Sequence, residues 1–110
     1  MKITIPTQLV LGVFLDEVGS DVFGLEIMKR TELTSGSCYT ILAKLENTGW
    51  IESRLEDAAV AARERRPRRR YYRLTGVGEA SAPQYCSQGA GGLLERIRNA
   101  REQHVPGLST

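Results

Sequence analysis

Apolar residues crowd the first part of the chain and predict a buried helix. In the run from Leu9 to Leu15, only Gly12 is not strongly apolar. Pro6 suits the first turn of a helix, so we expect the helix to begin there and to end near Val18. The run has the apolar character of a signal peptide, but a proline precedes it, two acids close it and no small-residue cleavage site follows. It is also too short to cross a bilayer, and we interpret it as a core helix.

Two further helices are predicted, joined by a tight turn. Apolar spacing predicts a helix at about Val22–Thr31, and Thr34-Ser35-Gly36 has the composition of a turn. A third helix is expected at about Ser37–Thr48, ended by Gly49 in a left-handed conformation. Four apolar residues at helical spacing predict its buried stripe: Cys38, Ile41, Leu42 and Leu45. The opposite face is polar with one positive charge, as a groove-reading surface requires, and comprises Ser37, Tyr39, Thr40, Lys44 and Asn47.

Alternating apolar and polar residues then predict a β-hairpin. Its strands are expected at Trp50–Leu55 and Arg70–Thr75. The spacer between them, roughly Glu56–Arg69, is long for a hairpin loop and is expected to be mobile. Helix, turn, helix and hairpin in this order are typical of a winged helix-turn-helix. In that fold, the second helix of the motif enters the major groove of DNA while the wing grips the backbone.

The charge distribution indicates what this hairpin binds. The chain carries a net charge of +2, but residues 63–73 hold seven arginines and one acid, so the rest of the chain is net acidic. In isolation, such a run fits a solvated loop equally well. Between two strands beside a helix-turn-helix it predicts a phosphate-binding wing, because guanidinium groups pair bidentately with phosphate oxygens. The arginines expected to hold phosphates are Arg66, Arg68, Arg69 and Arg70. Ser35, Gly36 and Ser37, at the start of the third helix, are expected to cap it and to offer amides to a further phosphate.

The remaining chemistry is sparse. Cys38 and Cys86 lack metal-ligand spacing, so we expect buried thiols rather than a disulfide, which fits a cytoplasmic location. The sequence offers no acid–base pair, no nucleophile constellation, no phosphate-binding glycine loop and no metal cluster. We therefore expect neither enzyme activity nor a cofactor.

After Gly78 the pattern weakens. Pro83 and three glycines interrupt a helix that could begin at Glu79, whereas residues 93–103 predict a better helix. We expect a DNA-binding domain at residues 1–78 and a C-terminal helical segment for dimerisation at 79–110. A short chain buries a modest core, and a two-fold operator needs a self-complementary protein surface. The apolar residues expected to supply this surface are Leu9, Val10, Val13, Phe14, Leu93, Leu94 and Ile97.

Several segments resemble the PadR family of bacterial transcriptional regulators: Ser35–Tyr39, Leu42, Leu45-Glu46, Gly49–Ser53 and Pro67–Thr75. The resemblance runs from about Leu9 to Gly78. It implies that Tyr39 contacts the DNA backbone, that a C-terminal helix packs across a homodimer, and that a small aromatic molecule acts as effector. The chain departs from the family pattern in two ways. Thr40 stands where proline is common, and no tryptophan of the kind that sandwiches flat ligands in some relatives occurs in the C-terminal segment.

Together, these patterns predict an α+β fold: a winged helix-turn-helix of three N-terminal helices and a two-stranded wing, then a C-terminal dimerisation helix. The expected function is that of a ligand-responsive repressor that binds double-stranded DNA as a homodimer in the cytoplasm, without a membrane partner. Two alternatives stay open, a winged-helix module that binds a protein partner and a nucleic-acid-binding protein without sequence preference. Salt dependence and competition with random DNA would separate the three.

Overall fold

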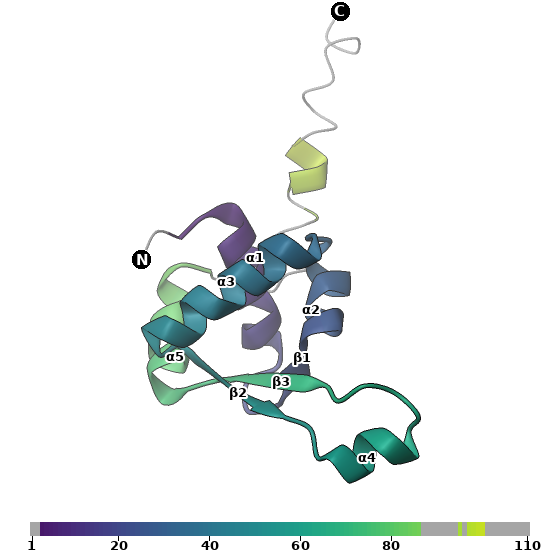
Figure 1. The fold of residues 1–110 in the computed structure, drawn as a ribbon. Coiled ribbons are helices and arrows are strands. Elements are labelled where there is room, and N and C mark those ends of the chain that lie inside the picture. Colours follow the sequence, from purple (N-terminus) through teal and green to yellow (C-terminus); the bar gives the residue numbers. More distant parts are fainter. Residues whose placement is uncertain (1–2, 87–94, 96, 101–110) are drawn as a thin grey trace, which may run out of the picture.

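Three helices and a small sheet make up the body of the protein (Figure 1). The computed structural model describes residues 3–86, 95 and 97–100. Hydrogen-bonded β2 (Ile51–Leu55) and β3 (Arg70–Leu74) form the wing that extends from the helices, and a further helix, α4 (Ala58–Arg63), lies at its far end. The α+β winged helix-turn-helix predicted from the sequence is confirmed. The elements are α1 (Ile5–Asp16), β1 (Val22–Phe23), α2 (Gly24–Thr31), α3 (Ser35–Thr48), β2 (Ile51–Leu55), α4 (Ala58–Arg63), β3 (Arg70–Leu74), α5 (Gly76–Ser81) and the 3₁₀ turn η1 (Ala82–Gln84).

Helix α1 is the centre of the core, as its unbroken apolar run predicted. The side chain of Thr4 caps it by accepting a hydrogen bond from the amide of Thr7, and it ends at Asp16, two residues before the expected Val18. Helices α2 and α3 and the turn η1 pack around it, so every residue from 9 to 14 is buried. Within the part of the chain that is described, no helix is both long and apolar enough to span a bilayer.

The predicted start of the second helix, at about Val22, is wrong. Val22 and Phe23 are extended and pair with Tyr72 and Tyr71 of β3, and α2 begins only at Gly24. The sheet therefore has three strands in the order β1-β3-β2, where the sequence predicted two. Pairing with a strand about fifty residues away, together with burial of Val22, outweighs local helical spacing.

Helix α3 carries the buried stripe that the sequence predicted, and Gly49 ends it in the left-handed region with φ of 85°. Its beginning differs from the prediction. The hydroxyl of Thr34 accepts a hydrogen bond from the amide of Ser37 at 3.3 Å, so Thr34 is the N-cap. Ser35 and Gly36 belong to the first helical turn rather than to the preceding turn.

The wing contains more structure than the mobile loop expected from its length. Strands β2 and β3 pair antiparallel from Ile51 opposite Leu74 to Leu55 opposite Arg70. Between them, the carboxylate of Asp57 accepts a hydrogen bond from the amide of Ala59 and caps α4. Alanine has the highest helix propensity and aspartate is a strong N-cap, so this segment carried a local helix signal that its flanking arginines obscured.

Residues after the wing form α5 and η1, where Pro83 suits the first turn of the 3₁₀ segment. Both cysteines are buried, as predicted. The C-terminal helix predicted at residues 93–103 lies only partly within the described residues, of which Glu95 and residues 97–100 are helical. Leu93 and Leu94 lie outside the described residues, so the dimerisation helix itself stays a prediction.

Candidate nucleic-acid interface

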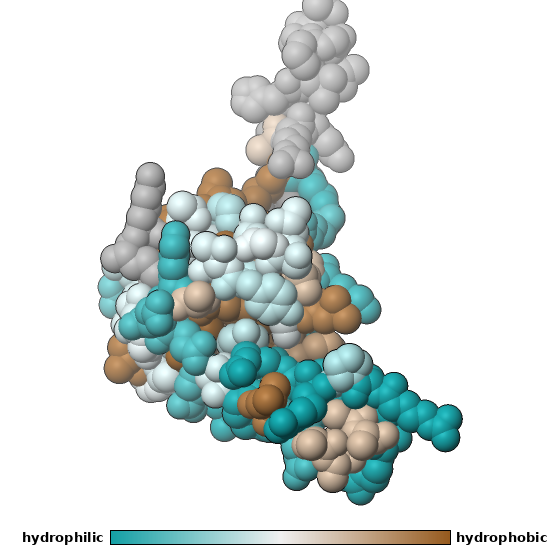
Figure 2. All heavy atoms as spheres, in the orientation of Figure 1, coloured by the Kyte–Doolittle hydropathy of each residue, from teal (hydrophilic) through white to brown (hydrophobic). Residues whose placement is uncertain are grey.

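The outer face of α3 is a continuous row of exposed polar side chains. Ser37, Thr40, Lys44 and Asn47 are all exposed, and they follow one another at helical spacings of three and four residues opposite the buried stripe. In Figure 2 this face of α3 is pale to teal, without a large apolar patch. The Thr40 hydroxyl donates a hydrogen bond to the carbonyl of Gly36 at 2.8 Å, so it can only accept a hydrogen bond from a ligand. A helix with one face in the core and a polar face outside presents donors and acceptors at fixed positions.

The N-terminus of α3 is open to solvent. Ser35, Gly36 and Ser37 are exposed, and a helix leaves the amides of its first turn without carbonyl acceptors inside the helix. Thr34 satisfies the amide of Ser37. The remaining amides and the positive end of the helix dipole suit an anion, as expected for a backbone phosphate.

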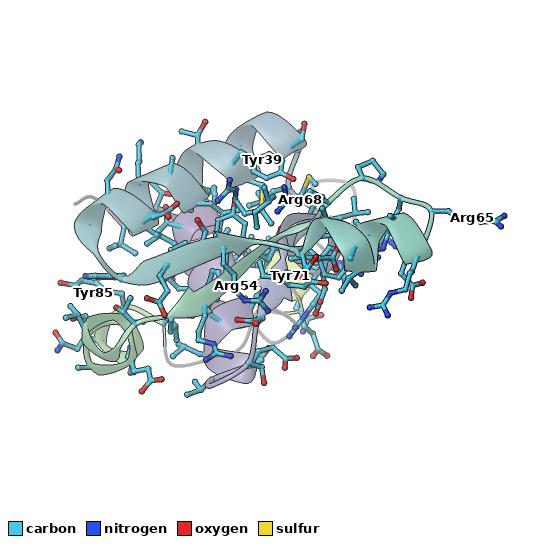
Figure 3. The ribbon with its side chains drawn as sticks, turned by 60° about the horizontal axis from the view of Figure 1, so that its bottom comes forward. Tyr39, Arg54, Arg65, Arg68, Tyr71 and Tyr85 are labelled. Carbon is cyan, nitrogen blue, oxygen red and sulfur yellow. The ribbon has the colours of Figure 1, made fainter. Side chains whose placement is uncertain are left out.

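Beside this row, a cleft of about 330 Å³ separates α3 from the wing. Tyr39 forms its α3 wall with 46% of its surface exposed, and Figure 3 shows Tyr39 on the side of α3 that faces Arg68. The cleft thus brings together the tyrosine and the arginines that the sequence placed in separate motifs. Its lining residues are Phe23, Gly24, Leu25, Tyr39, Arg66, Pro67, Arg68, Arg69 and Arg70.

Three of the four predicted arginines are held by contacts that leave donors free. The Nε of Arg68 donates to the carbonyl of Glu56 at 2.7 Å, and Nη1 of Arg70 donates to the Ser53 hydroxyl at 3.2 Å. The guanidinium of Arg69 lies 4.1 Å from the centre of the Phe23 ring, a cation–π contact. A guanidinium carries several N–H donors, so one contact each orients these side chains and keeps other donors available for phosphate.

Arg66 differs from the expectation. Its guanidinium forms a bidentate ion pair with Glu56, one hydrogen bond of which is 3.0 Å from Nη2 to Oε2. Glu56 is buried, and chiefly the hydrogen bond from Arg66 lowers the pKa of its carboxyl to about 2. The fork of Arg66 is therefore already occupied by a carboxylate. Glu56 was not predicted as a site residue, because an acid beside an arginine run shows no pairing until the chain folds back.

Other arginines are placed differently from those in the cleft. Arg54 and Arg73 both donate to Asp21, at 2.6 and 3.1 Å, and chiefly the hydrogen bond from Arg54 lowers the pKa of Asp21. Arg54 also lies over the ring of Tyr71 at 5.0 Å. By contrast, the exposed side chain of Arg65 points away from the body at the tip of the wing (Figure 3). The unpaired positive charge of the wing is thus concentrated at the cleft and the tip.

The residues expected to form a dimer surface are placed unevenly. Leu9, Val10, Val13 and Phe14 are at most 5% exposed in the protomer, and Val10, Val13 and Phe14 belong to its core cluster, whereas Leu9 also lines the cleft at Ile97. Ile97 is partly exposed and lines a separate cleft of about 480 Å³ with Ile5 and Leu33.

Comparison with known proteins agrees with this architecture. The sequence matches the transcriptional regulator PadR-like family over residues 10–84. A PadR family transcription regulator from Clostridium difficile R20291 has a TM-score of 0.61 at 21% identity, covering 91% of this chain and 97% of that chain. A transcriptional regulator from Clostridium thermocellum has a TM-score of 0.58 at 22% identity, with coverage of 91% and 89%. A PadR-like transcriptional regulator from Bacillus cereus has a TM-score of 0.56 at 20% identity, covering 92% of this chain and 94% of that chain.

No protein with a curated description matches the chain. At these identities the structural likeness shows the fold, and the family match covers more than half of the sequence. The chain belongs to the PadR-like family of transcriptional regulators.

Proposed function

We propose that this protein is a repressor that binds a specific double-stranded operator as a homodimer. In this proposal α3 reads base edges in the major groove, and the wing arginines hold the flanking phosphates. Two copies related by two-fold symmetry would occupy successive major grooves of a palindromic site and exclude polymerase. A small aromatic effector, which only the resemblance to the family implies, and a cytoplasmic location, which the two thiols fit, complete the proposal.

The observation that carries the proposal is the exposed polar row of α3 next to the arginine cleft. Lys44 and Asn47 stand in that row, and both side chains are exposed. Lysine donates to guanine O6 and N7, and asparagine pairs with adenine N6 and N7, so these two side chains suit direct readout of bases. Serine and threonine in the same row are short enough to let the helix approach the groove closely.

Phosphate contacts would fix the helix in register. The open N-terminus of α3 lies at one end of the polar row, and the cleft with Tyr39 and Arg68 lies beside it. Contacts of this kind supply affinity without sequence information, and they make binding depend on salt. In this arrangement the polar row of α3 contacts bases, and the α3 N-terminus and the cleft contact phosphates.

The test separates these two surfaces. An operator would be selected from a random DNA pool and compared with a scrambled duplex at constant salt. We expect Lys44→Ala and Asn47→Ala each to reduce the preference for the operator by about 1–3 kcal/mol, the value of one good base contact. Lys29→Ala, which removes one positive charge from the last turn of α2, is the control and should leave the preference unchanged.

Different outcomes point to the alternatives. If operator and scrambled DNA lose affinity equally in the α3 variants, Lys44 and Asn47 touch only phosphates. A pool that yields no enriched sequence would support a binder without sequence preference. Absence of salt-dependent affinity for any nucleic acid would support a protein-interaction module.

A further inference from the structure

We infer that Glu56 is the positioning residue that orders the wing arginines into a phosphate-binding surface. The inference rests on the proposed binding of DNA, because it concerns how that surface is built. Glu56 immediately follows β2, at the point where the wing leaves the sheet. It is an acid among arginines, and its contacts reach the far end of the same loop.

The carboxylate collects donors from three places in the returning chain. Arg66 binds both of its oxygens, the amide of Arg69 donates to Oε1 at 3.4 Å, and the Tyr71 hydroxyl donates to Oε2 at 3.2 Å. Among the side chains that the structure describes, Glu56 is one of three buried polar or charged residues. A buried carboxylate needs such partners, so the loop must close on it.

The backbone of the same residue adds two further links. The amide of Glu56 donates to the carbonyl of Arg69 at 2.7 Å, and its carbonyl accepts from Nε of Arg68 at 2.7 Å. One residue thus touches Arg66, Arg68 and Arg69 in succession. These contacts keep Arg69 over Phe23 and Arg68 in the cleft opposite Tyr39.

Electrostatics alone predicts that the negative charge of Glu56 weakens DNA binding. A carboxylate close to bound phosphates repels them, so removing it should strengthen the attraction of DNA. Any contribution of Glu56 to affinity must therefore come from geometry. Ordering long arginine side chains before the ligand arrives lowers the entropy cost of binding. The two effects have opposite signs, which makes the inference testable with a single substitution.

The experiment compares Glu56→Gln with Glu64→Gln. Glu64 lies in the same loop, is exposed, and has no hydrogen bond or ion pair to a side chain within the described residues. Both variants lose one negative charge. We expect Glu64→Gln to bind operator and random DNA up to about threefold more tightly, and Glu56→Gln to bind both about tenfold more weakly. Glu56→Gln that binds as tightly as Glu64→Gln would overturn the inference.

A second measurement does not depend on DNA. Trypsin cleaves after arginine, and mass spectrometry identifies which bonds are cut. We expect Glu56→Gln to be cleaved several-fold faster than wild type after Arg68, Arg69 and Arg70, and Glu64→Gln to match wild type at those bonds. Unchanged resistance in Glu56→Gln would overturn the inference. Equally fast cleavage after Arg30 and Lys44 would also overturn it, because Glu56 would then support the whole fold.

The two measurements also separate this inference from the proposed function. Wild-type protein that binds no DNA, combined with selective trypsin cleavage in Glu56→Gln, would overturn the proposed function. The same result would support Glu56 as the residue that holds the wing together.

Discussion

Two glycines are needed for space rather than for backbone conformation. A Cβ on Gly24 would lie 2.7 Å from the Tyr39 hydroxyl oxygen and 3.0 Å from a ring carbon. A Cβ on Gly78 would collide with the carbonyl oxygen of Trp50, which already accepts a hydrogen bond from the amide of Thr75. The obstacle is a half-exposed side chain in the first case and hydrogen-bonded backbone in the second. Their substitutions should therefore have different consequences.

We expect Gly78→Ala to lower the free energy of unfolding by about 1–3 kcal/mol, because overpacking against backbone outweighs the helix propensity of alanine. Gly24→Ala should change stability by less than about 1 kcal/mol, since Tyr39 can move aside. That movement displaces the tyrosine from the cleft, so Gly24→Ala should weaken DNA binding. Urea unfolding and DNA titration of both variants provide the test. A Gly24→Ala protein that binds DNA with wild-type affinity would show that Tyr39 does not contribute to binding.

At the scale of elements, the sequence pattern predicted those helices and strands whose formation depends on residues close together in the chain. The apolar run of α1, the stripe of α3 and the alternation of β2 and β3 were sufficient to predict the winged helix-turn-helix. Strand β1 was missed because Val22 becomes extended only by pairing with Tyr72 of β3. Glu56 was missed for the same reason, since its partners lie ten or more residues further along the chain. Contacts between distant segments were outside the reach of periodicity and composition.

The wing as an element should grip DNA without reading its sequence. Replacing Arg68, Arg69 and Arg70 by glutamine removes charge and preserves side-chain length. We expect this triple variant to lose affinity for operator and random DNA alike, and to flatten the slope of log K against log salt by up to about three. Arg54→Gln with Arg73→Gln is the control, because both arginines bind the Asp21 carboxylate outside the cleft, which offsets one of their two charges. A triple variant with the wild-type slope would show that Arg68, Arg69 and Arg70 do not contact DNA phosphates.

At the scale of the whole molecule, the burial of side chains on α1 bears on where two copies could meet. A palindromic operator requires two-fold symmetry, and three of the four α1 residues expected at the interface, Val10, Val13 and Phe14, are at most 1% exposed. An apolar surface beside α1 is the cleft lined by Ile5, Leu9, Leu33 and Ile97. Ile5 is 53% exposed, and an ion pair between Arg98 and Glu32 closes one side of this cleft. We propose this surface as the place where two copies meet.

Placing a carboxylate on this surface should separate the copies. We expect wild-type protein to sediment as a dimer at concentrations on the order of tens of micromolar, and Ile5→Glu with Ile97→Glu to sediment as a monomer, because burying unpaired carboxylates costs several kcal/mol. Val77→Glu is the control, since Val77 is 60% exposed on α5 and its substitution should leave the dimer intact. The monomeric variant should still bind a half-site, because α3 and the wing are unchanged, but with lower affinity for the full palindrome. A double variant that stays dimeric would exclude this surface, and a monomeric wild-type protein would contradict the two-fold operator itself.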